Sequence, residues 1–167
     1  MIHIRIAQLE DIDLIHQLGK AAFYPTYLPY ISEAQVDYMF HKMYDAQSLQ
    51  EQMNVRGDIF LIAYDDDDAS LGFASLQINY DGKQTSKLHK LYVLPDTQTK
   101  GIGKTLLHKA EEIARNAGEE NLLLNVNRYN KAVDFYKHLG YTIHRIDDID
   151  IGNGFFMNDY EMIKSIK

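Results

Sequence analysis

The spacing of apolar residues near the start of the chain predicts a strand followed by a helix. Apolar residues alternate from Ile2 to Ile6, which is the period of a strand. Between Ile12 and Ala22 they recur with the period of a helix, directly after an acidic start at Glu10. Pro25 and Pro29 interrupt this second pattern, so we expect the helix to end near them.

A second helix and a pair of strands are predicted next. Ser32, followed three residues later by Gln35, fits a capping box that opens a helix through about Tyr44. Residues 59–64 and 71–80 have the composition of strands, and the four aspartates between them indicate a turn. These two segments are therefore expected to form a β-hairpin.

The second half of the chain continues the mixture of strands and helices. Pro95 ends one predicted strand, and Gly118 and Gly140 each mark the end of a predicted helix. The predicted elements are a strand at 87–94, a helix at 102–117, a strand at 121–126, a helix at 132–139 and strands at 141–146 and 155–163.

Length and composition bound the class of protein. A chain of 167 residues, 46% hydrophobic and 25% charged, predicts one globular domain spanning 1–167. The chain has no cysteine, its first residues do not resemble a signal peptide, and its histidines show no spacing typical of metal ligands, so we expect a cytoplasmic protein with no metal. The net charge of −7 disfavours nucleic-acid binding and suits a cationic partner, and no membrane association is expected.

A loop that leads into a helix carries the clearest chemical signal. Residues 91–103 run from a strand through the loop to a helix N-terminus, where free amides and the helix dipole favour a phosphate. Gly101 and Gly103 allow the backbone to approach a ligand closely, and Lys100 and Lys104 add positive charge. We therefore predict a phosphate-binding loop.

Two families of phosphate loops do not fit this segment. A P-loop requires glycine where Gln98 stands, and the next buried strand ends without an acidic residue for magnesium. The dinucleotide fingerprint requires glycine where Leu106 stands and a position after the first strand. ATP hydrolysis and NAD binding are therefore disfavoured.

The segment from Gln98 to Gly103 matches the pattern Gln/Arg-x-x-Gly-x-Gly/Ala and resembles the GNAT superfamily of N-acetyltransferases. A second motif of that family follows about thirty residues later. It comprises Asn127, Asn130, Ala132, Phe135, Tyr136, Gly140 and Tyr141.

The resemblance implies the fold and the cosubstrate. It implies an α/β GNAT fold whose twisted, mostly antiparallel mixed sheet is flanked by helices and splayed between the fourth and fifth strands. The pantetheine arm of acetyl-CoA would complete the free strand edge like an added strand. By resemblance, the cofactor contacts are Leu91, Tyr92, Val93, Gln98, Thr99, Lys100, Gly101, Ile102, Gly103, Lys104, Asn127, Asn130 and Tyr136.

Two residues are candidates for proton transfer. The resemblance implies that Tyr136 protonates the departing sulfur of coenzyme A. The acceptor must lose a proton before it attacks, because an alkylammonium has a pKa of about 10. The histone acetyltransferases of the family have a catalytic glutamate at the position of Lys87, so the usual base is missing. We predict instead that His89, two residues further along the strand, removes the proton through a relay of water.

The acceptor pocket is expected between the first strand and the second helix. Aromatic rings and carboxylates there suit a cation, and the proposed substrate contacts are Phe23, Tyr24, Tyr27 and Tyr30. A looser resemblance to the bacterial spermidine and spermine acetyltransferases favours a small primary amine such as a polyamine. The alternatives are acetylation of a protein N-terminus or lysine, and a non-catalytic acyl-CoA-binding domain. The resemblance to this family also suggests a homodimer.

Overall fold

One sheet of seven strands organises the protein, with neighbours in the order β1-β2-β3-β4-β5-β7-β6. The computed structural model describes the backbone of residues 1–167 and every side chain except those of Gln98 and Thr99. All neighbouring strands are antiparallel except the parallel pair β4 and β5, which confirms the predicted class. The strands are β1 (His3–Ile6), β2 (Ile59–Tyr64), β3 (Ser70–Gln77), β4 (Thr85–Val93), β5 (Asn121–Asn127), β6 (Thr142–Gly152) and β7 (Phe155–Ser165).

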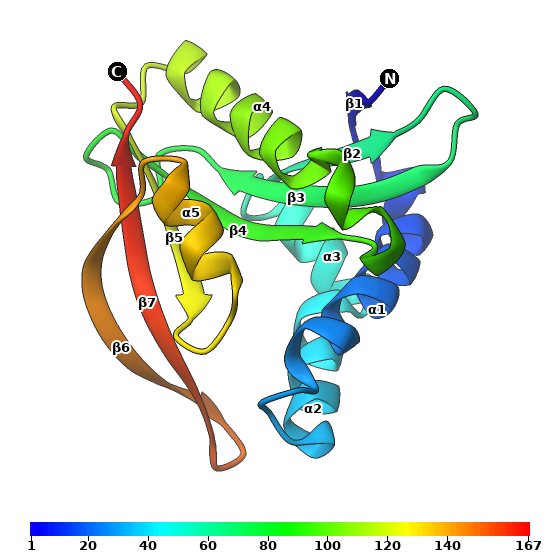
Figure 1. Cartoon of the computed structure of the whole chain (residues 1–167), viewed down its shortest axis with the longest axis vertical. Coiled ribbons are helices and arrows are strands. Elements are labelled where there is room, and N and C mark those ends of the chain that lie inside the picture. The colour runs from blue at the N-terminus through cyan, green and yellow to red at the C-terminus, as the bar shows by residue number, and fades with distance from the viewer.

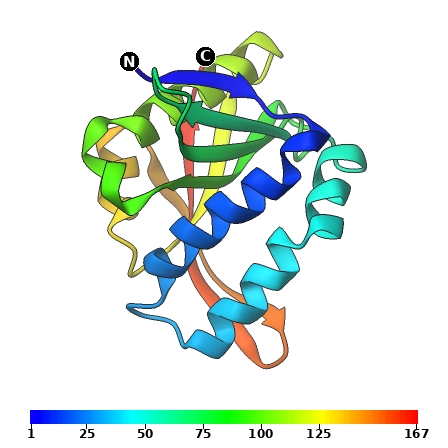
Figure 2. The ribbon, with the colours of Figure 1, turned by 90° about the vertical axis from the view of Figure 1, so that its right-hand side faces the viewer.

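Helices cover both faces of the sheet (Figures 1 and 2). Because side chains alternate along a strand, Phe60 and Ile62 pack toward one helical layer, whereas Leu61 and Ala63 pack toward the other. The first layer contains α1 (Ile12–Tyr27), α2 (Glu33–Tyr44) and α3 (Ala46–Asn54), and the second contains α4 (Ile102–Asn116) and α5 (Ala132–His138). Short 3-10 turns, η1 (Leu9–Asp11) and η2 (Pro95–Lys100), precede α1 and α4.

The first helix is longer than its prolines predict. Pro25 lies inside α1, which continues to Tyr27. A proline within a helix removes one backbone hydrogen bond, but Phe23 and Tyr27 of the same turns are buried in the core. Burial of these rings offsets the lost bond and extends the helix.

Two further elements differ from the sequence prediction. The helix α3 has no predicted counterpart, because Leu49 is its one buried residue and the apolar period is weak. The strand β6 reaches Gly152 rather than residue 146, because its acidic segment is held by pairing with β7 and not by apolar alternation. At α2, Ser32 accepts a hydrogen bond from the Gln35 amide, which is one half of the predicted capping box, while the Gln35 side chain donates to the Phe156 carbonyl instead.

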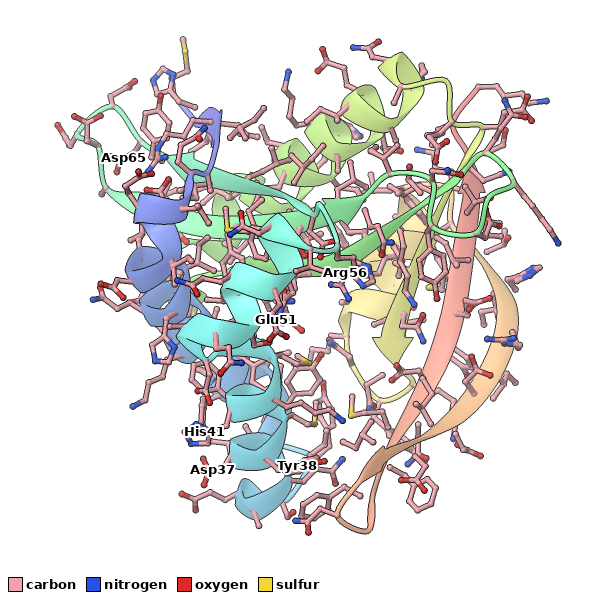
Figure 3. All side chains as sticks on the ribbon, turned by 180° about the vertical axis from the view of Figure 1, so that it is seen from behind. Asp37, Tyr38, His41, Glu51, Arg56 and Asp65 are labelled. Carbon is pink, nitrogen blue, oxygen red and sulfur yellow. The ribbon has the colours of Figure 1, made fainter. Side chains whose placement is uncertain are left out.

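The hairpin of β6 and β7 reaches across to α2. The Tyr38 hydroxyl donates to the Ile151 carbonyl at 2.8 Å, and the Gln35 side chain donates to the Phe156 carbonyl at 2.6 Å. Figure 3 labels Tyr38 on α2 beside the tip of this hairpin. The hairpin and the first helical layer therefore bound a common space.

No helix in the described part of the chain combines the length and the apolar character that crossing a membrane requires.

Candidate active site

The sheet opens between β4 and β5. The two strands pair only from Thr85 with Asn121 to Leu88 with Leu124. Beyond this point β4 continues to Val93, β5 also continues, and the two diverge (Figure 1). The edge of β4 that faces β5 therefore keeps free backbone N–H and C=O groups over residues 89–93.

A β-bulge lies where the opening begins. Ser75 of β3 is opposite Lys90 and Leu76 is opposite Leu88, so His89 is an extra residue in β4. A bulge bends its strand and increases the local twist. This irregularity turns the end of β4 away from β5.

A cavity of about 360 Å³ occupies the opening. Its walls come from β4, β5, α5 and the start of α4, and Thr26 and Tyr27 contribute from α1. The site residues predicted from the sequence that line it are Tyr27, His89, Leu91, Tyr92, Val93, Gly101, Gly103, Lys104, Asn130 and Tyr136.

The start of α4 presents free backbone amides at this cavity. Gly101 caps the helix with a φ of 72°, a left-handed conformation that favours glycine. A Cβ at Gly103 would lie 3.6 Å from the Phe135 ring, an ordinary van der Waals contact, so the packing of α4 against α5 does not itself require glycine there. The amides and the positive end of the helix dipole fit a phosphate group.

The other residues of the predicted loop differ in what they can contribute. The Ile102 side chain is fully buried, so only its backbone is available to a ligand. The Lys100 side chain is exposed. The predicted roles of the Gln98 and Thr99 side chains lie outside the described residues.

The two candidate asparagines occupy different surroundings. Asn130 lines the cavity, and its Oδ1 accepts a hydrogen bond from the Ala132 amide at the start of α5. Asn127 is buried, does not line the cavity, and its Oδ1 accepts from the Tyr129 amide. The side chain of Asn130 is thus the better placed of the two to contact a ligand.

Tyr136 lies on α5 with its ring packed edge-on against Phe135 and Tyr141. The residue is 7% exposed and lines the cavity. Burial raises the pKa of its hydroxyl, because the phenolate would lose the solvation of water. Tyr136 is therefore protonated at neutral pH and holds a proton beside the opened strand edge.

Of the four predicted acceptor contacts, Tyr27 lines the cavity, and the Tyr30 ring packs against it with centroids 5.9 Å apart. The Tyr27 hydroxyl forms a 2.9 Å hydrogen bond with the Tyr92 hydroxyl. Tyr24 donates to Asp37 of α2, and Phe23 is fully buried among neighbouring rings and lines neither cavity described here. Phe23 thus supports the wall and has no surface for an acceptor.

His89 and Lys90 line both this cavity and a second one, of about 760 Å³, toward α2 and α3. The His89 Nε2 is 2.8 Å from the Gln77 Oε1, and burial, with Arg56 nearby, lowers the His89 pKa to about 3. His89 is neutral at physiological pH and a weak proton acceptor. This geometry gives little support to the predicted relay.

Lys90 is buried at the junction of the two cavities. It is 5% exposed, its Nζ donates to the Gln52 Oε1 at 2.6 Å, and burial lowers its pKa to about 7. The second cavity is also lined by Lys42, Glu51 and Arg56, and Figure 3 labels the last two at α3 and the turn that follows it.

A buried carboxylate that the sequence analysis does not identify lies on β7. Asp159 is 6% exposed, and its Oδ2 accepts a hydrogen bond from the Asn125 Nδ2 at 3.4 Å. Burial raises its pKa to about 6. The same strand also contains Asn158, Glu161 and Lys164, so polarity and charge alone did not distinguish Asp159 in the sequence.

Across the described residues, no group of three or more histidine, aspartate or glutamate side chains is arranged to hold a metal ion.

Comparisons with known proteins agree with this geometry. A family model described as an acetyltransferase (GNAT) domain matches residues 27–164. The spermidine N(1)-acetyltransferase of Thermoplasma acidophilum is 29% identical over 155 residues, which cover 89% of this chain and 93% of that protein.

Two solved structures share the architecture. The PaiA N-acetyltransferase from Thermoplasma acidophilum, in complex with coenzyme A, superposes with a TM-score of 0.79 at 28% identity over 99% of each chain. A GCN5-related N-acetyltransferase from Rhodopseudomonas palustris superposes with a TM-score of 0.82 at 24% identity over 98% of this chain and 94% of the other, a likeness of fold. With its opened strand edge and its glycine-containing helix start, the chain belongs to the GNAT family of N-acetyltransferases, which use acetyl-CoA.

Proposed function

We propose that this enzyme acetylates the primary amine of a small cationic acceptor, with a polyamine as the leading candidate. The observation that carries the proposal is the meeting of two cavities at His89 and Lys90, because acetyl-CoA and the acceptor could then approach the same point from different sides. The similarity to a spermidine acetyltransferase over 89% of the chain supports the choice of acceptor.

The backbone of β4 and the start of α4 would hold the cosubstrate. The free edge at residues 89–93 matches the amide groups of pantetheine, which could add to it as a strand does. The first amides of α4 and the Lys104 side chain would bind the pyrophosphate. Bound acetyl-CoA supplies the activated acetyl group, and the protein supplies orientation and proton transfer.

Tyr136 is proposed as the general acid that protonates the leaving sulfur. By reference pKa values of about 10 for tyrosine and about 8.5 for a thiol, this transfer costs about 2 kcal/mol in water. Burial makes the phenolate less favourable, but a thiolate formed in the same cavity is also poorly solvated. The two effects oppose each other, so proximity decides whether the transfer is fast.

The acceptor region combines acidic and aromatic groups. Asp159 and Asp147 are opposite each other on β7 and β6, and Tyr27 and Tyr30 lie at the end of α1 and just after it. Asp147 is already paired with Arg145, so Asp159 is the carboxylate left for a cation. The proposed substrate contacts are therefore Tyr27 and Tyr30. The Tyr24 hydroxyl is instead engaged in a hydrogen bond to Asp37.

A second candidate acceptor is an amine that also carries a carboxylate, such as an amino acid or a peptide end. Lys42 and Arg56 line the second cavity and could bind an anionic group. Arg56 is already paired with Asp58, and Glu51 lines the same cavity, so this attraction is partly offset.

Purified protein with acetyl-CoA and a panel of amines tests the proposal, with released thiol as the readout. We expect turnover with spermidine or spermine and weaker turnover with amino acids and peptides. Turnover of a peptide N-terminus alone would replace the polyamine proposal with that of a protein acetyltransferase. Calorimetric binding of coenzyme A without any transfer would indicate a non-catalytic domain.

Replacing Gly101 with alanine should weaken coenzyme A binding several-fold and lower the free energy of unfolding by about 1 kcal/mol. Its φ of +72° is unfavourable for any residue with a Cβ, and relaxation would reorient the first amides of α4. Gly118→Ala is a matched control at the other end of α4, with a φ of +88° and, like Gly101, nothing within 4 Å of an added Cβ. Equal losses of coenzyme A affinity in both variants, measured by calorimetry, would contradict a role for the loop.

A further inference from the structure

Three buried oxygen atoms, one of them on a residue that lines the first cavity, have no hydrogen-bond partner in the described structure. They are the Tyr30 Oη, the Asn125 Oδ1 and the Asp159 Oδ1. An unpaired buried polar atom is costly, so such atoms in a native protein call for an explanation. The amide of Asn125 is oriented by its own donation to Asp159, which leaves its oxygen as an acceptor.

These atoms come from β5, β7 and the turn after α1, and they lie on the side of the sheet that faces the first helical layer. Tyr160 and Met162 of β7 pack into the core beneath α4, whereas Met157 packs toward α2, so Asp159 lies on the side of β7 that faces the first helical layer. The Tyr30 ring packs against the Tyr27 ring with centroids 5.9 Å apart, and burial, together with the charge of Asp159, raises the pKa of both hydroxyls. Asn125 and Tyr27 both line the first cavity, so the cluster adjoins the opening.

The chemistry of the cluster matches an ammonium group. An alkylammonium carries three N–H donors and no acceptor, and the cluster offers three oxygens, one of them anionic. The charged groups that act on Asp159 from the packed elements are Lys87 of β4, Arg128 after β5 and Asp147 of β6. Among the described residues no ion pair to Asp159 is formed: Arg128 is paired with Asp148, and the anionic Asp147 is paired with Arg145.

We propose that Asp159, with Asn125 and Tyr30, binds the ammonium of the acceptor and that Asp159 takes its proton. This inference rests on the proposed acetyl transfer to an amine and adds the base that the proposal lacks. A carboxyl group whose pKa lies near 6 is ionised at neutral pH and closer to the pKa of an amine than an ordinary aspartate is.

The proton and bond changes balance. The N–H bond of the ammonium breaks and its proton moves to the Asp159 carboxylate, which leaves a neutral amine. The nitrogen lone pair forms a bond to the acetyl carbon, the bond from that carbon to sulfur breaks, and Tyr136 protonates the sulfur. The second proton of the nitrogen restores Tyr136, and Asp159 returns its proton to solvent, so one proton is released per acetyl group transferred.

The test compares Asp159→Asn with Glu161→Gln in the full-length enzyme. Glu161 is a matched control on the same face of β7, is 8% exposed, and is already bonded to Arg145 Nη2 at 3.2 Å. We expect Asp159→Asn to lower kcat/KM for the amine about 100-fold and to leave coenzyme A binding unchanged. Glu161→Gln should retain near wild-type kcat/KM.

The pH dependence separates a base from a structural residue. In the wild type, kcat/KM should fall as the pH is lowered through about 6, because the base becomes protonated. Asp159→Asn should lose this acid limb, whereas Tyr30→Phe should keep the limb and raise KM for the amine about tenfold through one lost hydrogen bond to a charge. Retention of the acid limb in Asp159→Asn, or an equal loss of coenzyme A binding, would overturn the proposal.

A binding measurement distinguishes failure of the ammonium site from failure of the proposed acetyl transfer. If the wild type turns over no amine, calorimetry of spermidine with the complex of enzyme and coenzyme A still measures the ammonium site. Weaker binding in Asp159→Asn than in Glu161→Gln would then support the site without the reaction. Equal binding by the wild type and both variants would reject the site itself.

Discussion

Replacing Tyr136 with phenylalanine should lower kcat by about 100-fold or more, the usual contribution of a positioned general acid. The ring contacts with Phe135 and Tyr141 would remain, because only the hydroxyl is removed. Burial keeps this hydroxyl protonated in the wild type, so the variant loses a proton donor and not a charge. Steady-state kinetics and calorimetry of coenzyme A should show a fall in kcat with little change in affinity.

Tyr141→Phe provides the control for this variant. Tyr141 is also buried, contacts the Tyr136 ring and lines neither cavity. Its loss of a hydroxyl should leave kcat near the wild-type value. If Tyr136→Phe also kept the wild-type kcat, the acid would have to be another group or water, while the assignment of the cavity to acetyl-CoA would stand.

Replacing Lys90 with methionine should raise the free energy of unfolding by about 2 kcal/mol at pH 7. Lys90 is buried, and within the described residues it has no carboxylate partner and donates only to Gln52. Methionine has a similar length and no charge to desolvate. Chemical denaturation of both proteins across a range of pH measures the effect.

The sign of the pH dependence follows from the lowered pKa of Lys90. The pKa is 10.5 in the unfolded chain and about 7 in the folded protein. Between these values the unfolded chain binds a proton that the folded protein does not, so the stability of the wild type rises with pH. The cost of burial is therefore fully present below pH 7, and the advantage of the methionine variant should shrink as the pH approaches 10.5.

Lys20→Met is a control on the exposed side of α1. A lysine in water carries little burial cost, so its replacement should change stability by less than about 0.5 kcal/mol. A constant difference between Lys90→Met and the wild type from pH 7 to 10 would show that Lys90 is charged in the folded protein.

Periodicity predicted most of the fold because most elements bury one regular face. The helix α4 is the clearest case, with Leu106, Leu107 and Ala110 buried at helical spacing. The helix α3 and the acidic part of β6 were missed for the opposite reason. The helix α3 is held in part by Lys90, which donates to Gln52 from 38 residues away, and the acidic part of β6 is held by backbone pairing with β7, and neither contact leaves an apolar period.

The cosubstrate half of the site was predictable because it depends on a short continuous segment. Gly101 adopts the left-handed conformation that a helix start of this kind requires, and the loop, strand and helix are consecutive in sequence. Asn127 and Asn130 could not be separated by spacing alone, because their difference lies in which one reaches the cavity.

The acceptor half was less predictable because it is assembled from separate segments. Asn125 of β5 donates a hydrogen bond to Asp159 of β7 across a strand pair, and no spacing in the sequence predicts this contact. His89 was given a proton relay from its residue type, but its burial beside Lys87 and Lys90 lowers its pKa far below neutrality. Desolvation of a side chain depends on the whole fold and cannot be read from its neighbours in sequence.

The extra residue at His89 also determines which face of the sheet the side chains on either side of it point toward. Leu88 and Lys90 are two residues apart, yet Leu88 packs beneath α4 and Lys90 lies against Tyr44 and Phe60 on the other side. Deleting His89 would restore the regular alternation and reverse every side chain on one half of the strand. In sequence comparisons, a one-residue gap at this position would therefore mark a protein with a different interior and without the open edge.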